Sequence, residues 1–178
     1  MWINKESKQV YNSHSEIRAA FPAVSFPASL TEDDILFVGL APVVKTELSY
    51  NKLTHKAVET TPVLVNKVWK QKFNLVELTP EEKQKAESEF LTFVIKQTQA
   101  RLDAFAAQKG YDGILSLCTY ATSTVTKFKA EGQLGVDSRD LTWSALYKLL
   151  EDVKAGLVAA PVSYADVEQV LPVLTWPV

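Results

Sequence analysis

The sequence has little of the residue types that build disulfide, metal or cofactor sites. Its single cysteine, Cys118, excludes a disulfide bond within the chain, so the fold does not rely on one. The six glycines are isolated along the sequence and never form the run that cradles a phosphate group. The two histidines lack the spacing of a zinc site, and there is no second cysteine to complete one. The sequence therefore predicts no metal ion, no nucleotide and no other cofactor.

Long apolar runs and basic clusters are also missing. No stretch reaches the roughly 18 apolar residues that span a bilayer, so we expect no membrane insertion. The formal net charge is -2 and no basic run or stripe is present, so we expect no nucleic-acid partner. The first residues lack the hydrophobic core of a signal peptide. These features predict a protein that stays in the cytoplasm of its producing cell or leaves it inside an assembly.

The first half of the sequence carries signals for short elements joined by turns. Its composition, 47% hydrophobic and 22% charged, is typical of a globular protein. Residues 2–11 predict a small β-hairpin. Ser13 with Glu16, and Thr31 ahead of three acidic residues, predict the N-caps of two short helices. Gly39 is expected to end the second helix.

Alternating hydrophobic residues predict strands between residues 42 and 78. Residues 42–48 form one candidate strand, and residues 62–78 form a candidate hairpin that turns at Asn66-Lys67. Alternation places three apolar side chains on one face of the second hairpin strand: Trp69, Phe73 and Leu75. Tryptophan is enriched both in cores and at interface anchors, so this face either packs internally or docks a partner.

At Thr79 the hydrophobic period changes to that of a helix. Thr79 as N-cap, Pro80 at the first helical position and Glu82 as the reciprocal cap predict a helix that closes at Gly110. Its length of about 45 Å exceeds that of a domain of this size. Because its start is highly charged and its end is apolar, the first turns are expected to project as a connector.

The remaining residues predict further helices and an extended tail. Ser138 or Asp140 is expected to begin a helix that Gly156 ends, and Ser163 is expected to cap a short last helix. The chain then finishes in an apolar segment that contains Trp176. This tryptophan either folds back onto the helices or docks into another chain, and the sequence leaves both alternatives open.

Together these elements predict an α+β fold in three parts. Residues 1–78 form a small β-rich N-terminal domain with short helices. Residues 79–110 form a long connecting helix, and residues 111–178 form an all-α domain that packs with the end of that helix. The candidate interface residues are Trp69, Phe73, Leu75 and Trp176.

No catalytic constellation is evident, so the sequence predicts that the protein is not an enzyme. The alternative is a thiol hydrolase, which would need Cys118 exposed beside His14 or His55. Cys118 lies in a stretch of small and hydroxyl side chains that is typical of a buried, closely packed helix, and free cysteine is among the most buried residue types. We therefore assign Cys118 to packing.

Five short motifs in the second half resemble a known family. They are "RLDAFA" at 101–106, "GYD" at 110–112, "ATS" at 121–123, "KFKAEG" at 127–132 and "RDLTW" at 139–143. In this order they resemble a domain of unknown function that is common in tail proteins of tailed phages. In the first half, "HSEIRAAFP" at 14–22 and the hairpin that runs into "TPEE" also resemble such proteins.

The resemblance implies a non-enzymatic structural protein of the phage tail, associated with the tail fibre or baseplate and acting through protein–protein docking. The alternative that it implies is a chaperone for tail-fibre assembly that binds the fibre protein. Either role implies an oligomer or a heteromeric complex with a tail-fibre or baseplate protein. The expected location is the virion tail, or the host cytoplasm during assembly.

Overall fold

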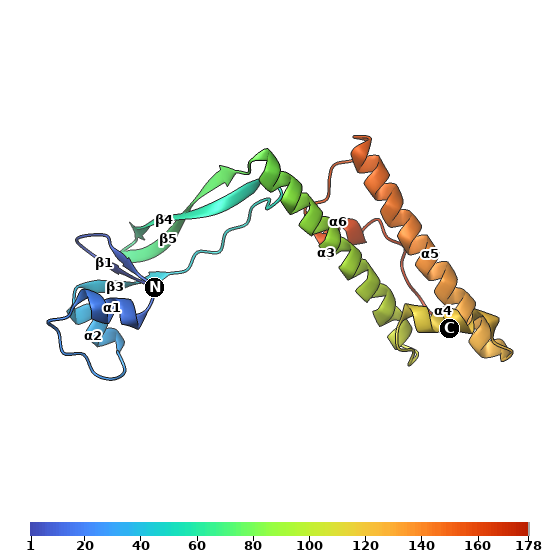
Figure 1. Ribbon diagram of the computed structural model, residues 1–178, viewed down its shortest axis with the longest axis horizontal. Helices are drawn as coiled ribbons and strands as arrows, with labels where there is room; N and C mark the ends of the chain where they lie inside the picture. The colour runs from blue at the N-terminus through green and yellow to red at the C-terminus, as the bar shows by residue number, and fades with distance from the viewer. Residues whose placement is uncertain (178) are drawn as a thin grey trace. The chain divides into compact units, whose positions relative to one another are not determined.

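A computed structural model describes residues 1–177 and shows an α+β fold (Figure 1). The chain divides into two compact units, one ending at Leu78 and one beginning at Thr79. The predicted connecting helix belongs to the second unit.

The first unit is built on a five-stranded sheet with the strand order β2-β1-β3-β5-β4. All neighbouring strands are antiparallel except β3 and β5, which are parallel. Figure 1 shows α1 and α2 beside β1 and β3, with β4 and β5 extending beyond them. The bounds are β1 (Trp2–Asn4), β2 (Val10–Tyr11), α1 (His14–Ala20), α2 (Glu32–Phe37), β3 (Leu40–Val44), β4 (His55–Val65) and β5 (Val68–Glu77).

The local signals in this unit are confirmed. Ser13 Oγ accepts the Glu16 amide at 3.2 Å, and Thr31 forms a reciprocal capping box with Asp34. Gly39 ends α2 with a φ of +78°, a left-handed conformation that glycine adopts without strain. Two strand boundaries differ from the prediction. Strand β4 begins at His55 rather than at residue 62, because its first half alternates weakly, and β3 spans Leu40–Val44 rather than 42–48.

The two faces of the sheet have separate cores. On one face Leu40 packs with Tyr11 and with Ile17 and Ile35 from α1 and α2. On the other face Ile3, Ala41 and Val43 pack together, with the half-buried Trp69 against them. We call the face that carries Leu40 and is covered by α1 and α2 the helix-covered face. The helices cover it over β1 to β3 only, since no residue of β4 or β5 belongs to that core cluster.

The second unit is helical. Thr79 forms the predicted capping box with Glu82, Gly110 and Gly156 take positive φ after the two long helices, and Ser163 caps the last helix. In Figure 1, α3 and α5 run alongside each other. The bounds are α3 (Pro80–Ala107), α4 (Ile114–Thr119), the 3-10 turn η1 (Tyr120–Thr122), α5 (Thr126–Lys154) and α6 (Tyr164–Glu168).

The predicted helix start at Ser138 or Asp140 is wrong, because α5 begins at Thr126 and continues without a break. Ser138 lies inside the helix, where its carbonyl accepts the Thr142 hydroxyl at 2.7 Å. The sequence misleads here because glycines and a serine normally mark helix ends. In this helix the glycines have a packing role instead.

Gly132 and Gly135 let α5 approach the segment 114–122 closely. A Cβ atom on Gly132 would lie 2.1 Å from the backbone nitrogen of Ala121, and one on Gly135 would lie 2.6 Å from Leu117 Cγ. At Gly132 the obstacle is backbone, so only a residue without a Cβ fits there, whereas at Gly135 the obstacle is a side chain. The stretch 114–122 is therefore packed closely against α5, and the glycines of α5 permit this contact.

Candidate functional site

In the first unit, most of the exposed large apolar side chains lie on the two-stranded ribbon formed by β4 and β5. Strand β3 pairs with it only at Val43–Trp69 and Val44–Lys70, so most of the ribbon has no third strand. An isolated two-stranded hairpin is at best marginally stable in water. The turn at Asn66-Lys67, predicted from the sequence, has positive φ at both residues, as a type I′ turn requires.

The predicted interface residues of the ribbon share one face, opposite the helix-covered face. Trp69 is half-buried against Val43, and the Lys8 ammonium lies 4.7 Å from its ring centroid. Phe73 is also half-buried, whereas Leu75 is 48% exposed. Trp69 thus anchors the ribbon to the sheet, and Leu75 is the most accessible of the three.

The other face of the ribbon continues the helix-covered face and carries exposed valines and lysines. The strand register places Lys70 beside Val44 and Lys72 opposite Thr60. Both lysines are exposed. We call this surface the lysine face, and its exposed valines and lysines are Val44, Lys56, Val58, Val65, Val68, Lys70, Lys72 and Val76.

The outer edge of the ribbon is protected against pairing with a further strand. The register of β4 shifts between Thr60 and Val63, and this irregularity contains Thr61 and Pro62. Proline has no amide hydrogen to donate, and bulges and prolines are common devices that block strand addition. A partner is therefore expected to contact a face of the ribbon rather than its edge.

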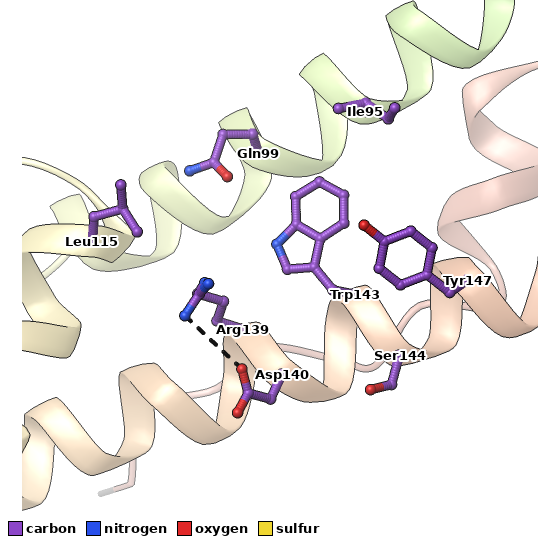
Figure 2. Close-up of a pocket in the computed structure, with 8 residues that line it drawn as sticks. All are labelled: Ile95, Gln99, Leu115, Arg139, Asp140, Trp143, Ser144 and Tyr147. Atoms are coloured by element: carbon purple, nitrogen blue, oxygen red, sulfur yellow. Dashed lines mark ion pairs between the residues drawn. The ribbon is translucent and has the colours of Figure 1, made fainter.

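The second unit has an open groove between α3, α4 and α5 (Figure 2). Its volume is about 600 Å³. Figure 2 shows the Trp143 indole between the two long helices, with Tyr147 beside it. The lining residues are Ile95, Gln99, Leu115, Arg139, Asp140, Trp143, Ser144 and Tyr147. The sequence gives no sign of the groove, because its lining residues come from three separate helices.

The polar end of the groove contains Arg139 and Asp140, whose side chains are 4.0 Å apart. Cys118 on α4 lies near Arg139. Burial raises the pKa of the Cys118 thiol, and the nearby Arg139 guanidinium offsets only part of this effect. A raised pKa leaves less thiolate, which is the nucleophilic form.

The two histidines have local contacts within the first unit, whereas Cys118 belongs to the second. The His14 ring lies 4.9 Å from the Trp2 ring, and His55 Nδ1 lies 2.9 Å from the Thr54 hydroxyl. The second unit contains no histidine of its own. The thiol hydrolase alternative therefore has no imidazole within the unit that carries the thiol.

We expect Cys118 of the native protein to react slowly with a thiol reagent at neutral pH and rapidly after unfolding. The physical reason is that the side chain is half-buried and that the pKa of the thiol is raised. The measurement is the labelling rate with and without denaturant, with free cysteine as the reference. A native rate equal to that of free cysteine would restore the thiol as a candidate nucleophile.

Several residues of the phage-like motifs have structural roles. Asp103 Oδ1 accepts the Ile114 amide at 2.9 Å at the start of α4, and the adjacent Gly113 leaves room for that carboxylate. Arg101 donates to the Pro172 carbonyl at 2.7 Å and lies 3.6 Å from Glu168. These contacts tie α4, α6 and the tail to α3.

Two further motif residues, Tyr111 and Glu131, link the start of α4 to α5. Tyr111 Oη donates to Glu131 Oε2 at 2.5 Å, and this hydrogen bond raises the pKa of Tyr111 to about 12. Like the other motif contacts, this one organises the helical unit.

Of the two alternatives for Trp176, the structure shows the one in which the ring folds back onto its own chain. Its indole stacks on Phe105 with ring centroids 4.7 Å apart, and Nε1 donates to the Phe105 carbonyl at 3.2 Å. Lys109 lies 5.7 Å from the same ring. Trp176 thus closes the core at the end of α3.

Within residues 1–177, no cluster of three or more His, Cys, Asp or Glu side chains is arranged to hold a metal ion. Over the same residues, no helix combines the length and apolar character needed to cross a membrane.

Comparisons with known proteins give no relative for this chain. No family model, no curated protein and no solved structure matches it. The resemblance to phage tail proteins therefore stays a prediction from the motifs.

Proposed function

We propose that the protein is a non-enzymatic structural component of a bacteriophage tail, located at the tail fibre or baseplate and acting by protein–protein docking. The observation that carries the docking role is the β4–β5 ribbon. It exposes aliphatic side chains on both faces, among them Leu64 at 56% on the Trp69 face and Val58 at 44% on the lysine face. Exposed apolar side chains gathered on one element are typical of an interaction site.

The form of the ribbon also supports docking. A two-stranded ribbon cannot bury either of its faces by itself, because it is a single layer and nothing packs on top of its side chains. Contact with a second surface would remove the valines and leucines from water, at about 25 cal/mol for each Å² of apolar area. The phage-like motifs supply the tail context, and the groove beside Trp143 offers a second surface for a partner.

The alternative role is a tail-fibre assembly chaperone that binds the fibre protein and is released. Mass spectrometry of purified phage particles distinguishes the two roles. We expect a tail component to be present at a fixed copy number relative to the other tail proteins. Absence from particles, combined with co-purification with the fibre protein from infected cells, would support the chaperone. Absence from both would contradict the proposed function.

A further inference from the structure

The helix-covered face of the sheet is complete over β1 to β3 and open over the ribbon. Leu40 on β3 is fully buried beneath the helices, whereas Val44, four residues along the same strand and on the same face, is 50% exposed. From Val44 the open surface continues across Lys70 and Lys72 to the valines of the lysine face. The helix layer of the unit thus stops part of the way across its own sheet.

Lys70 and Lys72 place positive charge on this open surface. The strand register places Glu59 and Glu77 on the opposite face of the ribbon, level with Phe73 and His55. Among the ion pairs of residues 1–177, none involves Lys70 or Lys72. A surface that complements the lysine face must therefore combine apolar side chains with acidic ones.

The outer side of α2 has this composition. Phe37 is 83% exposed and Leu36 is 40% exposed, which is unusual for large apolar side chains. Glu32 and Asp33 lie one turn earlier on the same short helix. Both are exposed, and neither forms an ion pair within residues 1–177. The inner side of α2 places Ile35 in the core, so the outward side is free for another contact.

The order and spacing of the two surfaces also match. Along α2, Asp33 and Phe37 are separated by about 6 Å at 1.5 Å per residue. Along β5, Val68 and Lys70 are separated by about 7 Å at 3.4 Å per residue. An α2 helix laid on the lysine face would place Phe37 and Leu36 over the valines near the turn. Its two carboxylates would then lie beside the two lysines.

We propose that the lysine face binds the outer side of α2 from a second copy of this chain. The second copy's α2 extends the helix layer over the part of the sheet that the chain's own helices leave open. Because the two contacting surfaces differ, the contact is head-to-tail. It produces a closed ring or an open filament according to the rotation between copies.

The first test measures self-association of the full chain by analytical ultracentrifugation over a wide concentration range at low salt. We expect concentration-dependent oligomers and weaker association at high salt, because the surface charges are then screened. Phe37→Ser is expected to weaken association about tenfold or more, since a buried aromatic anchor dominates such contacts. Val173→Ser, at a side chain that is 82% exposed in the other unit, is the matched control. A wild-type chain that stays monomeric at all concentrations overturns the proposal.

Charge reversal provides the second test. Lys70→Glu with Lys72→Glu in one protein, and Glu32→Lys with Asp33→Lys in another, should each abolish self-association. An equal mixture of the two proteins should associate again, because every contact then pairs opposite charges. Circular dichroism of each protein checks that it is folded. Failure of the mixture to associate, with both proteins folded, overturns the pairing of α2 with the lysine face.

This inference deepens the proposed docking role and rests on the ribbon being a docking surface, but the two fail separately. A protein that is present in particles at fixed copy number yet monomeric when purified contradicts the self-contact alone. A protein that self-associates as described yet is absent from both particles and fibre complexes contradicts the tail role alone.

Discussion

Replacing Gly132 with alanine is expected to lower the free energy of unfolding of the helical unit by about 3 kcal/mol or more. The new Cβ would lie 2.1 Å from the Ala121 nitrogen and 2.3 Å from the Tyr120 carbonyl carbon, so backbone must move. Overpacking in a core typically costs about 1–3 kcal/mol, and a backbone obstacle belongs at the upper end or beyond. Helix propensity alone predicts the opposite effect, because alanine in place of glycine inside a helix raises the free energy of unfolding by about 1 kcal/mol.

The measurement is chemical denaturation followed at 222 nm, where α3 and α5 dominate the signal because they are the longest helices. Gly135→Ala should lower the free energy of unfolding by less than Gly132→Ala does, because its obstacle is the Leu117 side chain, which can shift. Lys129→Ala, at an exposed position on the same helix, is the control and should change stability by less than about 0.5 kcal/mol. If Gly132→Ala is as stable as the wild type, α5 does not contact the 120–122 turn as described.

Replacing Trp176 with alanine is expected to lower the stability of the same unit by about 2–3 kcal/mol. Replacing a fully buried tryptophan with alanine lowers the free energy of unfolding by about 3–5 kcal/mol. We expect a smaller effect here because Trp176 is only half-buried. The loss combines its stacking on Phe105 with the hydrogen bond to the Phe105 carbonyl. The same denaturation experiment measures it.

Val173→Ala is the matched control for Trp176→Ala, because Val173 lies in the same tail and its side chain is 82% exposed. We expect this control to leave stability unchanged. A Trp176→Ala protein with wild-type stability that no longer binds a fibre protein would show that this tryptophan serves docking. The structure favours a loss of stability in Trp176→Ala, because the indole is already in contact with α3.

The motif residues of the helical unit and the ribbon residues of the sheet unit differ in their surroundings. The motif residues Arg101, Asp103 and Tyr111 bind other parts of the helical unit, and the glycines of α5 hold its helices close. In the sheet unit, Leu64 and Leu75 of the ribbon and Phe37 of α2 are exposed. We therefore expect substitutions in the helical motifs to act on stability first, and substitutions on the ribbon to act on association first.

Local signals in the sequence were sufficient to predict most helix and turn boundaries. Thr31, Thr79 and Ser163 form the expected capping boxes, and the Asn66-Lys67 turn is where the alternation places it. These features depend on residues within three or four positions of each other, so the chain need not be folded for them to be recognised. The α+β fold class follows from the same signals.

Only the tertiary structure decided the features that depend on contacts between distant residues. The sequence could not show that Gly132 lies against Ala121, that Trp176 stacks on Phe105, or that Trp143 lines a groove made by three helices. It also could not show that the lysine face continues a sheet surface that the chain's own helices cover only in part. The physical reason is that periodicity identifies which side of an element is apolar, whereas packing determines what that side meets.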